Sequence, residues 1–178
     1  MTVDIEIQYK SNSGIFNLKI EQCDDIEVIW EEIEDEYVLI NGKVDADFDI
    51  KEQIESIEVV SIDEGDEDLA QECADESLDM LHEYINLDPD SMIGFHILTK
   101  ELGRNLEESF QKCGSLYTIS EEDAEKETIE YFKDTDQINS NYLIGKIDWD
   151  EVIEDLCDDG TWYFSKNHNL YVTNYHNL

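Results

Sequence analysis

The sequence predicts an elongated α+β protein of two to three small lobes, with antiparallel β-hairpins and acidic amphipathic helices. The first observation is the strand-like alternation of apolar and polar residues in most of residues 1–62. The second is a change to helical spacing after residue 62. The third is a return to short strands and helices after residue 112. We therefore expect a mostly β N-terminal lobe (1–62), an acidic helical middle lobe (63–112) and an α+β C-terminal lobe (113–178).

The N-terminal lobe is predicted to begin with a β-hairpin. VDIEIQYK and IFNLKIE both alternate apolar and polar residues, and SNSG between them has the composition of a turn. These three segments together predict two antiparallel strands.

The rest of this lobe is predicted to hold a short helix and further strands. DDIEVIWEEIEDE has apolar residues at helical spacing. Asn41-Gly42 is a favoured two-residue hairpin turn and lies within YVLINGKVDADFDI, so we expect a second hairpin there. SIEVVSI is predicted to close the lobe as a strand.

The middle lobe is predicted to consist of three helices. The first runs from residue 63 to about 85, because apolar residues recur there every three or four positions. Its stripe consists of Leu69, Cys73, Met80, Leu81 and Tyr84. The segment around Pro89 breaks this helix, and helices over 91–102 and 106–112 follow.

The C-terminal lobe is predicted to combine strands with two capped helices. SLYTI is strand-like, and Ser120 begins a capping-box-like segment ahead of a helix. Asp148 is the expected cap of a second helix. TWYFSKNHNLYVTNY is predicted to form a terminal hairpin that turns at 166–168.

The net charge is the most unusual property of the chain. It is −36, from 47 acidic and 11 basic residues, and residues 52–99 contain 15 carboxylates with no Lys or Arg. A compact chain of this length would be about 40 Å across, and about 24 phosphates occupy that length of duplex DNA. The charge density therefore matches or exceeds that of DNA, which makes nucleic acid and anionic membranes poor partners.

A nucleic-acid-binding protein is the partner that this charge favours. Lys and Arg provide much of the affinity of such proteins for phosphates, and carboxylates on a rigid scaffold can occupy the same groove. We therefore predict a DNA mimic whose acidic surface binds the partner. We define this acidic surface as Glu31, Glu32, Asp35, Asp63, Glu64, Asp66, Glu67, Asp68, Glu72, Asp75, Glu76, Asp79 and Glu83.

No motif in the sequence indicates catalysis, a cofactor or a metal site. There is no phosphate-binding glycine loop, nucleophile elbow or zinc-binding His spacing, and the apparent calcium loops at Asp45 and Asp155 fail at required positions. The four cysteines lie 40 to 50 residues apart, without a C-x-x-C pair, signal peptide or membrane-spanning run. We expect a non-enzymatic cytoplasmic protein with free thiols, no cofactor and no metal.

The C-terminal part resembles the ArdA-type antirestriction proteins. The resemblance covers about residues 104–175 and is clearest in KIDWDEVIEDLCDDGTWYFSKNHNLYVTNY. The matching positions are Ile147, Asp148, Trp149, Asp155, Leu156, Gly160, Thr161, Asn167 and His168. Glu154 stands where the family usually carries Arg, and Val152 where an aromatic residue is common.

The resemblance implies a curved protein that mimics bent DNA and occupies the DNA-binding groove of type I restriction-modification enzymes. Such proteins are carried by phages or conjugative elements, often act as homodimers, and use no catalytic residue. The aromatic C-terminal lobe then offers Trp149, Trp162 and Tyr171 as dimer contacts.

Two alternatives remain open from the sequence. The same mimicry could target another nucleic-acid-binding defence complex, such as a CRISPR effector. A different class of function is that of an acidic adaptor or chaperone for a basic DNA-binding protein, which an apolar groove would favour.

Overall fold

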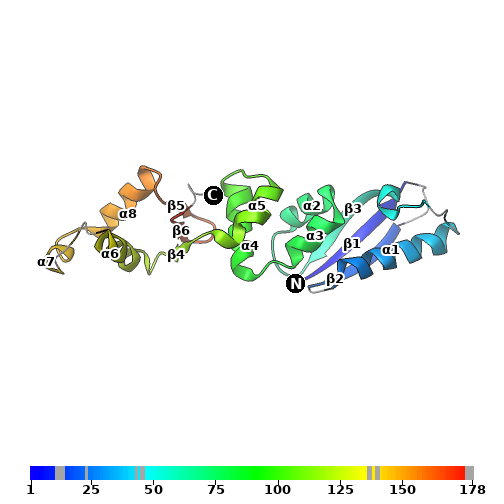
Figure 1. Cartoon of the computed structure of the whole chain (residues 1–178), viewed down its shortest axis with the longest axis horizontal. Coiled ribbons are helices and arrows are strands. Elements are labelled where there is room, and N and C mark those ends of the chain that lie inside the picture. The colour runs from blue at the N-terminus through cyan, green and yellow to red at the C-terminus, as the bar shows by residue number, and fades with distance from the viewer. Residues whose placement is uncertain are drawn as a thin grey trace. The chain divides into compact units, whose positions relative to one another are not determined.

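The chain is an α+β protein that forms two compact units, Met1–Met92 and Ile93–Leu178 (Figure 1). The computed structural model describes residues 1–10, 15–22, 24–42, 44, 47–135, 138 and 141–174, without the side chains of residues 141 and 142. The division between the units falls inside the segment expected as a middle lobe. Residues 63–92 of that segment belong to the first unit, and residues 93–112 belong to the second.

A three-stranded antiparallel sheet forms the centre of the first unit. Its strands are β1 (Thr2–Tyr9), β2 (Ile15–Glu21) and β3 (Ile54–Ile62), in the order β2-β1-β3. Ile5 of β1 lies opposite Leu18 of β2 and Val59 of β3. The predicted first hairpin and closing strand are thus confirmed, whereas the predicted turn at 11–14 lies outside the described residues.

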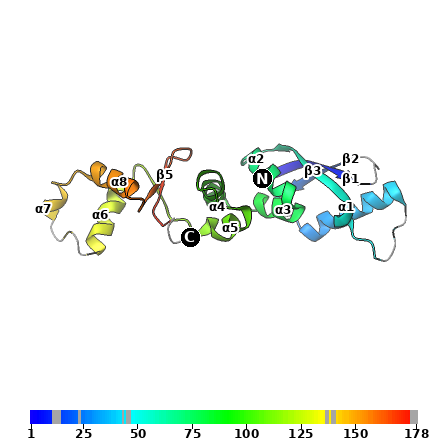
Figure 2. The same cartoon turned by 90° about the horizontal axis from the view of Figure 1, so that it is seen from above.

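Helix α1 (Ile26–Asn41) runs along the sheet, as Figures 1 and 2 show. Every second side chain of β1, from Val3 to Tyr9, is fully buried, and the apolar stripe of α1 is buried with them. The Tyr9 hydroxyl donates to the backbone oxygen of Ile33 at 3.2 Å, and its ring meets that of Tyr37 edge-on at 5.1 Å. Burial, reinforced by Glu36 and Tyr37, raises the pKa of Tyr9 to about 12.

The predicted second hairpin at Asn41-Gly42 is wrong, because this dipeptide ends helix α1. Gly42 has a left-handed φ of 88°, and its N–H donates to the Val38 oxygen at 2.8 Å. The buried stripe Ile29, Ile33 and Tyr37 has a four-residue spacing that continues the helix through the segment expected as a strand. A 3-10 turn, η1 (Ile50–Gln53), leads into β3.

The predicted single helix over 63–85 is wrong in two respects, since it begins only at Glu67 and is divided in two. Helices α2 (Glu67–Glu76) and α3 (Leu78–Ile85) meet at Ser77, whose backbone is extended. The Ser77 hydroxyl accepts from the N–H of Met80 at 3.1 Å and so begins α3. Serine competes for helix backbone groups in this way, and the apolar stripe alone does not reveal the break.

Helix α2 packs against β3, the edge strand of the sheet, and one of its amide side chains bonds the backbone of that strand. Gln71 accepts from the N–H of Val59 at 2.7 Å and donates to the oxygen of Ile57 at 3.0 Å. These two contacts satisfy backbone groups of β3 that a further strand would otherwise use. The edge is thereby covered by an acidic helix.

The second unit begins with a group of helical segments. Helix α4 (Pro89–His96) starts in the last residues of the first unit and continues as a π-helical turn, η2 (Ile97–Glu101). Helix α5 (Leu106–Lys112) and the 3-10 turn η3 (Cys113–Ser115) follow. The helices expected at 91–102 and 106–112 are therefore confirmed. Phe95 packs on Phe110, with ring centroids 4.4 Å apart.

A small antiparallel sheet and three helices complete this unit. The sheet has the order β4-β6-β5 and consists of β4 (Thr118–Ser120), β5 (Tyr163–Ser165) and β6 (Leu170–Val172). The helices are α6 (Ala124–Asp134), α7 (Asn141–Ile144) and α8 (Trp149–Asp158). Ile119, Ala124, Ile153 and Trp162 form a core that the sheet shares with α6 and α8. The predicted terminal hairpin is confirmed.

The two predicted helix starts in this unit differ in outcome. Asp148 caps α8 as expected and accepts from the N–H of Glu151 at 3.4 Å. The Ser120 hydroxyl accepts from the N–H of Asp123 and donates to its carboxylate, but these contacts close a turn before α6. The helix itself begins after Asp123, whose side chain makes no cap bond.

Gly94 allows α4 to approach η3, which gives a stability prediction. A Cβ at Gly94 would overlap the carbonyl oxygen of Cys113 and lie 3.2 Å from a methyl carbon of Leu116. We expect Gly94→Ala to destabilise the second unit by about 1–3 kcal/mol, because overpacking outweighs the gain in helix propensity. Urea unfolding followed by tryptophan fluorescence measures the change. Gly145→Ala, where a Cβ meets nothing within 4 Å, should change stability by less than about 0.5 kcal/mol. Equal effects would contradict this account of Gly94.

Candidate functional site

The carboxylates of the acidic surface lie almost entirely in solvent. All thirteen residues belong to the first unit; twelve are exposed and Asp66 is half-buried. Ten of them lie on or just before α2 and α3, and the other three lie on α1. The opposite faces of α2 and α3 are buried through Leu69, Leu81 and Tyr84. The negative charge is therefore presented by helices that are ordered by a core.

Four members of the acidic surface also make hydrogen bonds within the protein. Asp63 accepts from the N–H of Thr2 at 2.6 Å, and this contact is the main cause that lowers the pKa of Asp63. Asp66 caps α2 by accepting from Leu69, and Asp75 accepts from Gln71. Asp79 is the fourth. These four side chains stabilise the fold, so their replacement would test more than partner binding.

Asp79 belongs to a small contact group that joins three elements of the first unit. Lys51 of η1 donates to Asp79 at 2.9 Å and lies 4.5 Å from the ring centre of Trp30. The indole N–H of Trp30 in α1 also donates to Asp79, at 3.3 Å. Burial opposes ionisation of Asp79, yet these hydrogen bonds and the charge of Lys51 hold its pKa below the ordinary value.

The cysteines of the first unit offer no reactive thiol among the described residues. Cys73 lies on the buried face of α2 and is fully buried. Burial raises the pKa of its thiol to about 12, and Glu72 and Glu83 add to the effect. A thiol with this pKa is protonated at neutral pH and is a poor nucleophile. Among the described residues, Cys73, Cys113 and Cys157 form no disulfide, as expected, and Cys23 lies outside the described residues.

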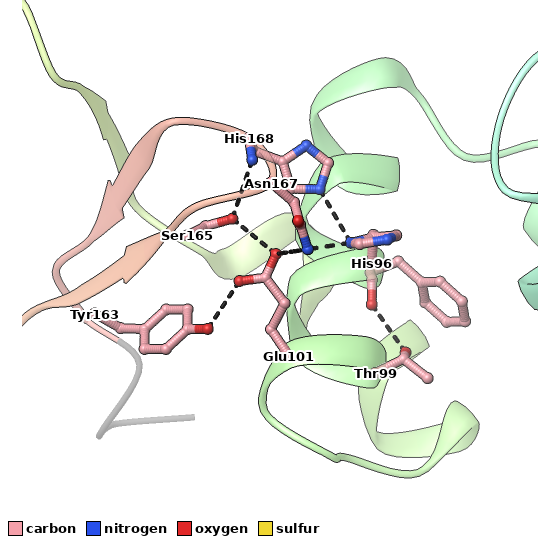
Figure 3. Close-up of polar contacts among 8 residues, drawn as sticks. His96, Thr99, Glu101, Tyr163, Ser165, Asn167 and His168 are labelled. Atoms are coloured by element: carbon pink, nitrogen blue, oxygen red, sulfur yellow. Dashed lines mark hydrogen bonds and ion pairs between the residues drawn. The ribbon is translucent and has the colours of Figure 1, made fainter.

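The second unit contains a different kind of site, which we call the His–Glu cluster: His96, Glu101 and His168. Within the described residues, this is the group of three His, Cys, Asp or Glu side chains whose ligand-type atoms all lie within 4.8 Å of one another. His96 Nδ1 and His168 Nε2 are 3.0 Å apart, and the two rings are nearly perpendicular. Figure 3 shows both imidazoles beside the Glu101 carboxylate.

Glu101 is held by side chains from the terminal hairpin. The Tyr163 hydroxyl donates to one carboxylate oxygen at 2.8 Å, and the Ser165 hydroxyl donates to the other at 2.9 Å. The Asn167 amide donates to that second oxygen at 3.1 Å. The side chain of Glu101 is only 8% exposed. Its charge is thus buried but compensated by hydrogen bonds, as buried carboxylates require.

The π-helical turn explains how His96 and Glu101 come together. Residues five apart in an α-helix point about 140° away from each other. In η2 the N–H of Leu102 instead donates to the oxygen of Ile97, five residues earlier, at 3.0 Å. This wider turn brings residues five apart onto neighbouring positions of one face. His168 reaches the same place from the turn between β5 and β6.

The electrostatics of the His–Glu cluster favour a neutral His168. Burial is the main cause that lowers the pKa of His168, and His96 lowers it further. The Glu101 carboxylate acts in the opposite direction without reversing the shift. Because His96 Nδ1 and His168 Nε2 are 3.0 Å apart, one ring nitrogen can donate to the other, or both can offer lone pairs to a cation.

The predicted dimer contacts have mixed positions in the second unit. Trp149 and Trp162 are each 6% exposed and pack within the core, while Tyr171 is half-buried against Trp162 and Phe164. The Trp149 indole donates to the oxygen of Ile144 at 3.0 Å. These contacts give all three residues a role within the unit, and a dimer role stays a prediction.

Sequence reasoning did not identify the His–Glu cluster. His96 and His168 are separated by 72 positions in the chain. No local spacing motif links these residues. The local signal that the sequence does offer is the terminal hairpin turn, which carries Ser165, Asn167 and His168 within four positions.

Comparisons with known proteins returned no relative: no family model, curated protein or solved structure matches this chain. Among the described residues, no helix is both long enough and apolar enough to cross a membrane.

The lowered pKa of His168 can be measured directly. In the metal-free protein with a chelator present, NMR titration should place its midpoint below the ordinary histidine value of about 6.5. Glu101→Gln should lower the midpoint further, because it removes the one carboxylate that favours the imidazolium. His96→Gln should raise it. Since the folded chain binds this proton less readily than the unfolded chain, the group's contribution to stability falls as the pH drops below about 6.5. An unshifted midpoint in the wild-type protein would contradict the packing around His168.

Proposed function

We propose that this protein is a DNA mimic that inhibits a DNA-binding defence enzyme by occupying its DNA-binding groove. The observation that carries the proposal is the row of exposed carboxylates along 63–83, within a 48-residue segment that has no Lys or Arg. The Lys and Arg side chains that bind DNA phosphates also attract carboxylates. Because α2 and α3 are already ordered by burial, binding loses less conformational entropy than the binding of a disordered acidic tail.

The charge supports the class of partner, and the ArdA resemblance supports its identity. On that resemblance, the proposed target is a type I restriction-modification enzyme. Two of the matching residues have clear local roles: Asp148 caps α8, and Gly160 adopts a left-handed φ of 78° where the chain turns toward β5. In this proposal the protein uses no catalytic residue and no cofactor. It acts in the cytoplasm of the host cell and forms a homodimer through its C-terminal part. A CRISPR effector or another nucleic-acid-binding defence complex would present the same kind of basic groove.

A hollow in the second unit favours a second candidate, an adaptor for a basic protein. It has a volume of about 460 Å³ and is lined by Tyr117, Tyr131 and Trp162 together with Glu127, Glu130 and Asp134. Aromatic faces beside carboxylates suit Lys or Arg side chains of a peptide. An adaptor would bind its basic partner without competing for the partner's DNA site, which separates the two candidates.

We predict that DNA and this protein compete for one site on the target. Increasing concentrations of the protein should release a labelled duplex from a type I restriction enzyme, and raising the duplex concentration should weaken the inhibition proportionally. Gel-shift and anisotropy titrations measure both effects. The affinity should fall as salt is raised, because the attraction between exposed charges is screened. A ternary complex of enzyme, DNA and this protein would refute competition.

We also predict that inhibition depends on many carboxylates rather than on one. Each exposed charge contributes little alone, so Glu76→Gln should change the inhibition constant by less than about threefold. Neutralising Glu64, Glu67, Asp68, Glu76 and Glu83 together should weaken inhibition by about 100-fold or more, if each contributes about 0.6 kcal/mol. This set avoids Asp63, Asp66, Asp75 and Asp79, which hold the fold.

A matched block on the second unit provides the control. Glu107, Glu122, Glu125, Glu151 and Glu154 are also exposed, and their replacement by Gln removes the same charge. We expect this control block to weaken inhibition much less than the block on α2 and α3. Equal losses would show that net charge alone acts, and loss of all inhibition from one carboxylate would indicate a specific site instead.

A further inference from the structure

The His–Glu cluster combines three metal-ligand side chains in one partly buried place. We propose that His96, Glu101 and His168 bind one divalent transition-metal ion, with Zn²⁺ the best match. The ligand atoms are His96 Nδ1, His168 Nε2 and a carboxylate oxygen of Glu101. The inference does not depend on DNA mimicry, because the acidic surface belongs to the first unit and the cluster to the second.

The spacing of the three ligand atoms is close to that of a zinc site. With Zn–N bonds of 2.0–2.1 Å and tetrahedral angles, two ligand nitrogens lie about 3.3 Å apart. His96 Nδ1 and His168 Nε2 are 3.0 Å apart, so a small opening is sufficient. Nδ1 of His96 lies 4.0 Å from the nearer oxygen of Glu101, and this distance must close by less than about 1 Å. The ion would take the place of the single proton between the two rings.

The surroundings of Glu101 are those that metal-binding carboxylates need. Ligating carboxylates are themselves oriented by hydrogen bonds, and Tyr163 and Ser165 donate to the two oxygens of Glu101. In Figure 3, Tyr163 and Ser165 lie on one side of the Glu101 carboxylate and the two imidazoles on the other. The exposed Asn167 amide donates to the Glu101 oxygen that lies nearer to His96, and a bound ion would displace it from that oxygen.

The ligand types select the metal. Two imidazoles favour Zn²⁺, Cu²⁺ or Ni²⁺, whereas Mg²⁺ and Ca²⁺ prefer oxygen ligands alone. The cluster should therefore bind Zn²⁺ in the presence of Mg²⁺, even though the many carboxylates attract any divalent cation weakly. Three protein ligands leave a fourth position for water. The ion would also connect η2 to the turn between β5 and β6, and so stabilise the second unit.

Cobalt substitution tests the site without an activity assay. Metal-free protein is titrated with Co²⁺ in buffer that contains millimolar Mg²⁺ to saturate the surface carboxylates. We expect visible absorption bands of four- or five-coordinate Co²⁺ that saturate at one ion per chain and disappear when one equivalent of Zn²⁺ is added. Absence of these bands, or uptake of several equivalent ions, would overturn the proposal.

Variants then assign the ligands. His96→Gln, His168→Gln and Glu101→Gln should each weaken Zn²⁺ binding by at least about 100-fold, since the loss of an outer partner alone costs about 10–100-fold. Tyr163→Phe, which removes one donor to Glu101, should weaken it by about tenfold. His82→Gln is the control and should leave binding unchanged, because His82 lies in the first unit and contacts the Asp24 oxygen. Equal binding by wild type and His168→Gln would refute the assignment.

A measurement on the wild-type chain keeps the test independent of variant folding. Nitrogen-15 NMR of the imidazole rings should show Zn²⁺-induced shifts of His96 Nδ1 and His168 Nε2, with His82 unaffected. Shifts at His82 alone, or at no described histidine, would show that the His–Glu cluster is only a hydrogen-bonded contact between η2 and the hairpin.

Discussion

Mutual repulsion among carboxylates is the constraint that the rest of this structure must overcome. In α2, Asp68, Glu72 and Glu76 follow one another at four-residue spacing, and each such like-charge pair costs about 0.2–0.5 kcal/mol. Burial of a large apolar side chain contributes about 1.5–3 kcal/mol, and Leu69, Leu81 and Tyr84 are all buried beneath α2 and α3. A few well-buried residues therefore outweigh many unfavourable pairs, and the acids can remain unneutralised.

Acidic residues also contribute to order at the beginnings of the helices. The side chains of Asp25, Asp66 and Asp148 accept hydrogen bonds from backbone N–H groups in the first turns of α1, α2 and α8. A negative charge at this end interacts favourably with the helix dipole. Among these three helices, no basic residue occupies the last turn. Some carboxylates thus fix where helices start, while most of those on α2 and α3 lie exposed to solvent.

The sequence predicts features that depend on local pattern and misses those that depend on competition or distance. The alternation in β1 and the capping by Asp148 are local, and both appear as expected. Asn41-Gly42 suits the end of a helix as well as it suits a hairpin turn. The packing of Tyr37 on Tyr9 favours the helix here. Ser77 interrupts a continuous apolar stripe because its hydroxyl caps α3. The His–Glu cluster depends on a π-helical turn and on a hairpin 72 positions from His96, which periodicity does not encode.

The contact of Gln71 with β3 has a consequence for how this protein behaves among copies of itself. An open strand edge invites pairing with another chain, and natural proteins often protect such edges with charge. Here the amide of Gln71 occupies the N–H of Val59 and the oxygen of Ile57, while Glu72 and Asp75 beside it are exposed. A second molecule that approached this edge would have to displace α2 and bring its own carboxylates against those of the first. The same charge density from which we infer a basic partner would thereby also oppose aggregation through β3.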